Sequence, residues 1–247
     1  MTEPQSGRYL VREAETPSDL ARVRALRAHC FGNATLHEAD PFDTAARQFL
    51  IEPREGTEPV CSFRLTAFDA SNLHRSYSAQ FYDLAALDRF PGAMLELGRF
   101  CVHPDWHDPD ILRLAWGRLA GEVDALKAEL LFGCSSFAGI AAETYCNAFA
   151  LLNVRHLAPE AWRPGVKAPE VVRFAALPPS DPRAGLQALP PLLRSYLAMG
   201  GWVSDHAVVD RAMNTLHVFT GLEIAAIPAG RKRLLRGLSA PKHAAGH

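Results

Sequence analysis

The sequence lacks any long hydrophobic run. Its longest charge-free, mainly apolar stretch, residues 130–142, falls short of the roughly 18 residues that a membrane-spanning helix requires. The first seven residues are polar, and no apolar segment of a secretory leader follows them. We therefore expect a cytoplasmic protein that contacts the inner surface of a membrane only peripherally.

Cysteine is scarce, and no two cysteines form a CxxC pair. Their number is odd, and each has apolar neighbours, which is typical of buried, reduced thiols rather than of a disulfide framework. The five are Cys30, Cys61, Cys101, Cys134 and Cys146.

Metal-binding and nucleophile motifs are also missing. His29, His37, His103 and His107 have no spacing of the HxxxH kind, so we predict no metal site. The "CSS" at Cys134 lacks the glycine frame of a nucleophile elbow.

An excess of one charge is absent as well, because 26 basic residues face 27 acidic ones. With 48% hydrophobic and 21% charged residues, the composition is that of a soluble globular enzyme, and nucleic acid is an unexpected partner. A length of 247 residues fits one large α/β unit or one domain with a decorated end. The exception is the segment 231–242, which is basic and follows the last acidic residue, Glu223.

Periodicity indicates alternating strands and helices. A strand at 8–14 precedes a helix within 16–31 that Ser18 can cap, and residues 46–53 and 59–68 read as a hairpin with Gly56 in its turn. Further along we expect strands at 93–103 and 130–136 and a last strand at 214–222. Between them we expect a helix within 108–129, capped by Asp108 or Asp110, and a helix at 140–152. The strands 93–103 and 130–134 should pair in parallel as a right-handed βαβ unit.

The stretch "LELGRFCVHP", residues 95–104, places Glu96 and Arg99 within an apolar strand. An unpaired buried charge costs several kcal/mol, so the two either satisfy neighbours or face a site. Residues three apart point to opposite faces of a regular strand, but Gly98 suggests a bulge that would turn both side chains the same way and free a backbone N–H.

Several segments together resemble a known family: "ALRAHCF", "DPFDTAARQFL", "FRL", "FYDLAAL", "LELGRFCVHPDW", "LFGCSSF", "LPPLLRSYLAMGGWV" and "VVDRAMNTLHVF". Over residues 8–236 the chain resembles the acyltransferases of the Gcn5-related N-acetyltransferase (GNAT) fold that use acyl carrier protein. The resemblance is longer to the ornithine lipid synthases than to the acyl-homoserine lactone autoinducer synthases.

This resemblance implies a mixed central sheet flanked by helices. The acyltransferase core would span residues 1–177, and a C-terminal extension, 178–247, would pack on that core within the same domain. A tryptophan of the autoinducer synthases is missing from "GNATLHEA", which speaks against the lactone activity, and Phe100 stands where ornithine lipid synthases often have a small polar residue.

The resemblance also suggests site residues. Glu96 would act as the base with Arg99 as its catalytic partner, and the backbone at Gly98 and Phe100 would hold the thioester oxygen. The residues that match positions of substrate contact are Arg27, Phe31, Asp40, Asp43 and Arg64.

Each role has a structural alternative. Glu96 could simply pair with an arginine. Asp40 and Asp43 suit the second ammonium of ornithine, but Asp43 could instead cap a short helix, "DTAARQF". Arg27 could pair with either aspartate and organise the loop.

The sequence lacks the glycine-rich loop that would bind coenzyme A, and this indicates the kind of acyl donor. Coenzyme A users of this fold cradle the pyrophosphate with a glycine-rich loop at a helix start, but residues 103–116 contain no glycine. Asp105, Asp108 and Asp110 would repel phosphate there. We therefore expect no tightly bound cofactor and a phosphopantetheine arm supplied by acyl carrier protein.

Acyl carrier proteins are acidic, so a basic surface should dock them. The tail residues Arg231, Lys232, Arg233, Arg236 and Lys242 could meet the carrier protein or an anionic membrane, or form a solvated helix end; Arg113 and Arg118 are alternative docking residues.

The sequence thus predicts an L-ornithine Nα-acyltransferase that moves a 3-hydroxyacyl chain from acyl carrier protein to the α-amine and gives lyso-ornithine lipid. Lysine or glutamine as acceptor, a homoserine lactone synthase, and a non-catalytic carrier-protein binder are the alternatives.

Overall fold

The computed structural model describes residues 5–32, 40–56, 58–177 and 181–239. It has two compact units, and each is assembled from separated segments of the chain. The first unit comprises residues 1–66, 97–127 and 228–247, and the second comprises 67–96 and 128–227. The division into a core, residues 1–177, and a C-terminal extension, residues 178–247, stays a prediction. Strand β6, Ala93–Val102, contributes its first residues to the second unit and its last to the first.

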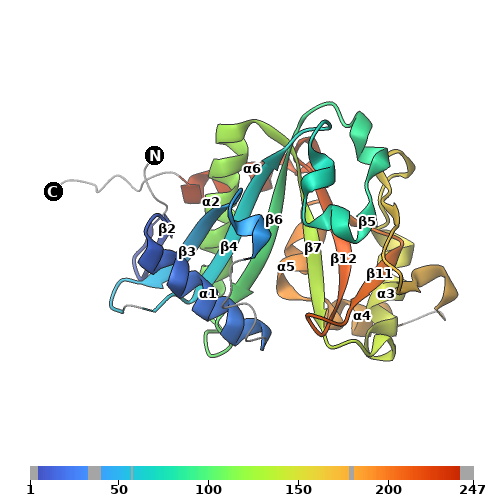
Figure 1. Cartoon of the computed structure of the whole chain (residues 1–247), viewed down its shortest axis with the longest axis horizontal. Coiled ribbons are helices and arrows are strands. Elements are labelled where there is room, and N and C mark those ends of the chain that lie inside the picture. Colours follow the sequence, from blue (N-terminus) through green and yellow to red (C-terminus); the bar gives the residue numbers. More distant parts are fainter. Residues whose placement is uncertain (1–4, 33–39, 57, 178–180, 240–247) are drawn as a thin grey trace. The chain divides into compact units, whose positions relative to one another are not determined.

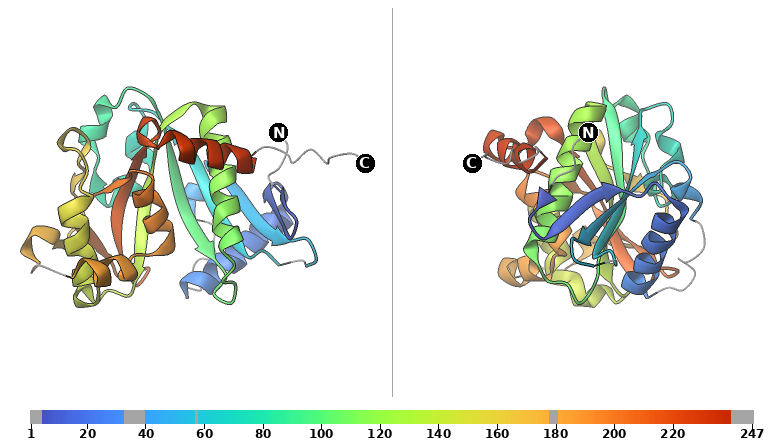
Figure 2. Two further views of the ribbon diagram at one scale, coloured as in Figure 1. Left: turned by 180° about the vertical axis from the view of Figure 1, so that it is seen from behind. Right: turned by 90° about the vertical axis from the view of Figure 1, so that its left-hand side faces the viewer.

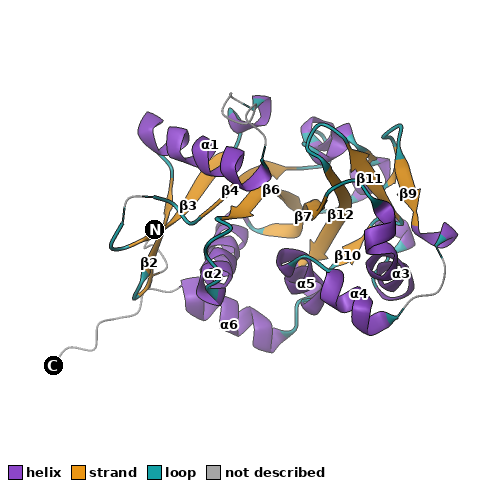
Figure 3. Ribbon diagram, turned by 90° about the horizontal axis from the view of Figure 1, so that it is seen from below, coloured by secondary structure: helices purple, strands orange, loops and turns teal. Residues whose placement is uncertain are grey.

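The first unit is built on antiparallel strands in the order β1-β2-β3-β4, followed by the last part of β6. The strands are β1 (Gln5–Ser6), β2 (Tyr9–Glu13), β3 (Arg47–Pro53) and β4 (Cys61–Phe68). Helix α1 (Pro17–Phe31) covers one face of this sheet, while α2 (Pro109–Leu126) and α6 (Ala229–Ser239) cover the other (Figures 1 and 3). The predicted hairpin of 46–53 and 59–68 is confirmed.

Helix α1 begins at Pro17, and its cap lies two residues before the predicted one. The Thr16 side chain accepts a hydrogen bond from the Asp19 backbone N–H, and the Asp19 carboxylate accepts one from the Thr16 N–H. This reciprocal capping box overturns the prediction that Ser18 caps the helix, because a cap must precede the first helical turn. For α2, the cap is Asp108 rather than Asp110.

Helices α2 and α6 lie side by side (Figure 2). A Cβ atom at Gly117 would come within 2.8 Å of the Leu238 Cβ atom, so this glycine permits the close approach. Arg236 on α6 also pairs with Asp124 on α2 at 2.8 Å.

The second unit contains the parallel pair of the fold. Residues 93–96 of β6 pair in parallel with β7 (Ala128–Ala138), which confirms the predicted βαβ pairing. Beyond β7 the order is β12 (Thr215–Glu223), β11 (His206–Asp210) and β9 (Val171–Arg173), all antiparallel, and β10 (Trp202–Val203) also pairs with β12. The sheet is therefore mixed, as predicted.

Two layers cover this second sheet (Figure 3). One face carries 3₁₀ turns at Leu73–Arg75, Ser78–Gln80, Ala85–Arg89 and Glu160–Trp162 and the short pair β5 (Tyr82–Asp83) with β8 (Gly165–Val166). The other face carries α3 (Cys146–Arg155), α4 (Pro182–Ala188) and α5 (Pro191–Ala198). Further 3₁₀ turns lie at Pro41–Asp43, Ala142–Tyr145, Phe174–Ala176 and Ile224–Ala226.

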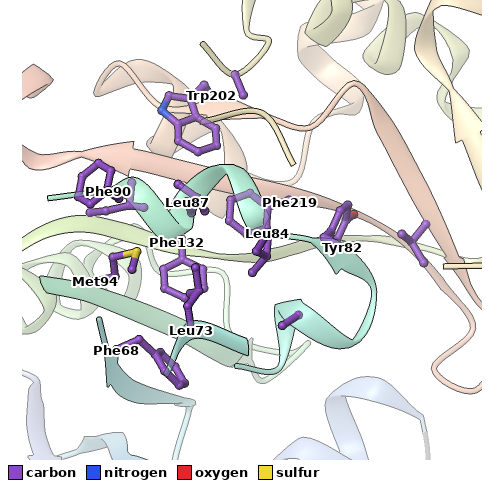
Figure 4. Close-up of a cluster of buried hydrophobic side chains, with 14 of the residues drawn as sticks. Phe68, Leu73, Tyr82, Leu84, Leu87, Phe90, Met94, Phe132, Trp202 and Phe219 are labelled. Carbon is purple, nitrogen blue, oxygen red and sulfur yellow. The ribbon is translucent and has the colours of Figure 1, made fainter. Parts of the chain in front are cut away.

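Burial follows this layering. On the first face, Phe132, Phe219 and Trp202 form the centre of a large apolar cluster (Figure 4). On the other, Phe137, Phe149 and their neighbours pack under α3 and α5. All five cysteines are free thiols, but only Cys61 and Cys101 are buried; Cys30, Cys134 and Cys146 are half-buried, contrary to the prediction.

Within the described ranges, no helix combines the length and apolar character needed to cross a membrane.

Candidate active site

Glu96, the predicted base, lies on β6 in the second unit and is only 5% exposed. Its carboxylate accepts hydrogen bonds from the Tyr77 N–H at 3.0 Å, the Ser78 N–H at 2.8 Å and the Ser78 hydroxyl at 2.6 Å. These donors belong to the start of the 3₁₀ turn Ser78–Gln80. These three donors hold the Glu96 carboxylate in one orientation.

The other predicted charged residues gather in the first unit. The Arg27 Nη1 atom lies 2.9 Å from both Asp43 carboxylate oxygens, and Arg64 Nη1 lies 2.8 Å from Asp43 Oδ1. Arg64 Nη1 also lies 2.9 Å from Asp40 Oδ2, which accepts a further bond from Arg99 Nη2 at 2.8 Å. We call these five side chains the arginine–aspartate network.

The network has more cations than anions. Three guanidinium groups face two carboxylates, so its formal charge is +1. Burial alone would raise the pKa of Asp40 and Asp43, but the arginines outweigh it, and both pKa values lie below the ordinary one. Both aspartates are thus charged and engaged by arginines. Guanidinium groups bind carboxylates, so an anionic substrate group is a chemically suitable partner for these arginines.

Two structural alternatives raised by the sequence are resolved here. Arg27 pairs with Asp43 rather than Asp40. The expected helix "DTAARQF" is wrong, since β3 begins at Arg47 and only a 3₁₀ turn, Pro41–Asp43, precedes it. Asp40, not Asp43, caps that turn by accepting from the Phe42 N–H.

The backbone distortion in β6 lies one residue beyond its predicted place. Arg99 has a φ of 51°, in the left-handed region, whereas Gly98 has no positive φ. A non-glycine residue in this region is uncommon and occurs where surrounding contacts hold it. The Asp40–Arg99 ion pair is such a contact. A Cβ atom at Gly98 would lie 3.0 Å from Arg64 Nε, so a larger residue there would crowd the Arg64 side chain.

The aromatic candidates take peripheral and core positions. Phe31 is half-buried at the end of α1, and the half-buried Phe100 stacks on Phe63 with ring centroids 6.0 Å apart. Trp116 and Phe132 belong to the core.

Two carboxylates lie at the start of α2. Asp108 caps it and accepts a hydrogen bond from the Tyr9 hydroxyl at 2.8 Å, and Asp110 lies in its first turn. Within the described residues, no group of three His, Cys, Asp or Glu side chains is placed to hold a metal ion.

Sequence reasoning missed two partners of these residues. Ser78 holds Glu96, and Gln48 bonds both Asp43, at 2.8 Å, and Arg27. The signal for Gln48 was its place as a polar residue in the apolar strand "RQFLIEP"; Ser78 lies in an irregular segment with no such pattern.

Comparison with known proteins places the chain in a family. A model described as "Acetyltransferase (GNAT) domain" matches residues 23–117. The L-ornithine N(alpha)-acyltransferase of Rhodobacter capsulatus is 36% identical over 77% of this chain and 76% of its own length. The protein of that name from Brucella abortus is 30% identical over 77% of this chain and 71% of its length, and that from Agrobacterium fabrum is 36% identical over 63% and 54%.

Among solved structures, an N-acyl amino acid synthase from uncultured soil microbes matches with a TM-score of 0.47 and 12% identity over 91% of this chain and 93% of its own. The AHL synthase LasI matches with a TM-score of 0.45 and 14% identity over 94% and 96%. From its sequence relatives, the chain belongs to the family of L-ornithine Nα-acyltransferases and is an N-acyltransferase with a GNAT domain.

Proposed function

We propose that this enzyme transfers a 3-hydroxyacyl group from acyl carrier protein to the α-amine of L-ornithine and so forms lyso-ornithine lipid. The observation that carries the proposal is the 36% identity to the Rhodobacter capsulatus enzyme over three quarters of both chains. The held carboxylate of Glu96 supports it.

In the reaction, the neutral α-amine attacks the thioester carbonyl carbon, a C–N bond forms and the C–S bond breaks. The thiolate leaves on the phosphopantetheine arm, and the amine loses a proton. An α-amino group titrates at about 7.7 to 8.0, so a modest base suffices. Glu96 takes this proton, directly or through water, and the Tyr77 and Ser78 donors orient its carboxylate for this role.

The amino acid's carboxylate is the anionic group that the arginine–aspartate network would take. Arg99 is its contact, since its side chain is 13% exposed whereas that of Arg64 is 3% exposed. Arg27, Arg64, Asp40 and Asp43 position Arg99. The backbone N–H of Gly98 or Phe100, beside the left-handed Arg99, receives the developing oxyanion, and Phe31 contacts substrate.

Acyl carrier protein is the proposed donor. Its phosphopantetheine arm carries the acyl group, and we propose no tightly bound cofactor. The carboxylates of Asp108 and Asp110 at the start of α2 disfavour a free coenzyme A pyrophosphate. The exposed basic residues of α6, Arg231 and Arg233, suit an acidic carrier. We place the enzyme in the cytoplasm, with α6 also able to touch the inner membrane surface; Lys242 lies outside the described residues.

The test is mass spectrometry of lipids from a bacterium that makes 3-hydroxyacyl carrier protein but no such lipid, with and without this chain. A new hydroxyacyl-ornithine is the expected product; soluble enzyme without any acyl-amino acid would refute the proposal. With purified enzyme, Glu96→Gln should lower the rate at least about tenfold at neutral pH. The control is Glu129→Gln, an exposed glutamate on β7, which should keep full activity.

A further inference from the structure

The second unit holds a buried polar cluster that the proposed chemistry does not use. His206 on β11 is 0% exposed and His217 on β12 is 2% exposed. Val208 pairs with His217 across the strands, and His206 lies two residues from Val208, so both imidazoles project from the same face of the sheet. Both pack against the Tyr82 ring, with centroids 5.2 and 5.6 Å away.

The hydrogen bonds define the tautomer of each ring. His206 Nδ1 lies 2.6 Å from the Asp205 carboxylate, which can only accept, so Nδ1 carries the proton. The Tyr82 hydroxyl donates its one proton to the His217 carbonyl oxygen at 2.8 Å. The His217 Nδ1 atom, 3.2 Å from the same hydroxyl, therefore donates to it.

The two Nε2 atoms are left as acceptors. Neither has a hydrogen-bond partner within the described part of the chain, although both are buried. A buried acceptor without a donor costs free energy, and such a group calls for a reason. Two of them on one face of one sheet indicate a site for a donor that another molecule supplies.

The surroundings define what kind of donor fits. Tyr82, Val208 and Phe219 belong to the apolar cluster on this face, as Figure 4 shows for Tyr82 and Phe219. Burial lowers the pKa of both imidazoles, that of His217 to about 3, so both stay neutral. An ammonium would lose its hydration beside these neutral imidazoles and the apolar side chains, whereas a hydroxyl on a hydrocarbon body would not carry that penalty.

The cluster lies on the same sheet face as the proposed base. The Ser78 hydroxyl bonds Glu96 and lies 3.5 Å from the Cys134 sulfur. Cys134 pairs with Phe219, which is two residues from His217 and projects from the same face. Phe81, which is half-buried, packs edge-on against His217, with ring centroids 4.8 Å apart.

We propose that the pair of His206 and His217 recognises the hydroxyl group of the acyl chain, whose single proton one of the two Nε2 atoms accepts, and that this makes the enzyme prefer hydroxyacyl over unsubstituted donors. This inference rests on the proposed function, and it assigns the recognition of the hydroxyl to two named side chains.

The test compares kcat/KM for two carrier-protein donors of equal chain length, one 3-hydroxyacyl and one unsubstituted, with ornithine as acceptor. The wild type should prefer the hydroxyacyl donor about tenfold, which corresponds to about 1.4 kcal/mol. In His217→Phe and His206→Phe this ratio should fall toward one. His156→Phe, a half-buried histidine outside the cluster, should keep the wild-type ratio.

A second measurement does not depend on folded variants. In wild-type enzyme labelled with ¹⁵N-histidine, 3-hydroxyacyl-pantetheine should shift the Nε2 resonances of these histidines more than acyl-pantetheine does. Equal kcat/KM for both donors in the wild type, or a ratio unchanged in both variants, would overturn the inference. A changed preference between ornithine and norvaline, with the donor ratio unchanged, would also overturn it and assign the pair to the acceptor. Absence of turnover with either donor would instead refute the proposed function.

Discussion

At the scale of single residues, Asp43 is the centre of the arginine–aspartate network. Its carboxylate accepts from two arginines and from Gln48, and one of these arginines, Arg27, is only 2% exposed. A guanidinium this deeply buried depends on its counter-ion, because removing one partner of a buried pair leaves an uncompensated charge. Asp43 therefore stabilises the first unit, whatever it also does for substrate.

We expect Asp43→Asn to lower the free energy of unfolding by about 3 kcal/mol at pH 7. The pKa of Asp43 is lowered in the fold, so its contribution is fully present above the unfolded value of about 3.9 and is lost as pH falls through the folded pKa. The difference between wild type and variant should thus shrink below about pH 4. Urea unfolding at several pH values measures it, with exposed Asp88→Asn as control. A difference that stays constant with pH would contradict this account.

At the scale of elements, the capping box of α1 gives two hydroxyl residues different roles: Thr16 caps the helix, whereas Ser18 lies in its first turn. Thr16→Ala should cost about 1 kcal/mol, because it leaves the Asp19 N–H without its acceptor. Ser18→Ala is the matched control, since Ser18 is exposed within the first turn and should change stability by less than about 0.5 kcal/mol. Thermal unfolding of both variants checks this. Equal losses would show that the cap is not at Thr16.

Several elements could be predicted because their signals are local. The strands around 46–53, 59–68 and 214–222 alternate or run apolar between turn residues, and α2 follows an aspartate cap. By contrast, β9 and β11 were not predicted. Each is short, and its strand character depends on pairing: β11 with β12, and β9 with β11. Pairing with strands distant in the sequence cannot be recognised from the residues of a short segment alone.

The candidate site shows the same limit. Charged residues in an apolar strand pointed to Glu96 and Arg99, and the family resemblance pointed to Arg64. The left-handed residue of β6 could not be found, because the glycine beside it is the residue that favours a positive φ, and the fold places that φ at Arg99. The tertiary contact of Arg99 with Asp40 helps to hold this conformation, and such a contact cannot be read from the strand's own sequence.

At the scale of the whole molecule, a net charge of −1 conceals an uneven distribution. Helix α6 bears four basic residues and no acidic one. Arg236 is engaged by Asp124, but Arg231 and Arg233 are exposed beside Leu234, which is 61% exposed. A basic surface with an exposed apolar residue suits an acidic helical partner or an anionic lipid surface.

If this surface docks the carrier protein, the double variant Arg231→Glu/Arg233→Glu should raise the KM for acyl carrier protein about tenfold at low salt and leave kcat unchanged. The effect should weaken as salt rises, because the screening length falls from about 10 Å at 0.1 M to about 3 Å at 1 M. The KM for acyl-pantetheine, which lacks the carrier, should not change. Arg155→Glu/Arg194→Glu reverses two exposed arginines in the second unit and controls for net charge. Equal KM values for wild type and the α6 variant would exclude α6 from docking the carrier, whereas weaker binding of that variant to anionic vesicles alone would assign α6 to the membrane.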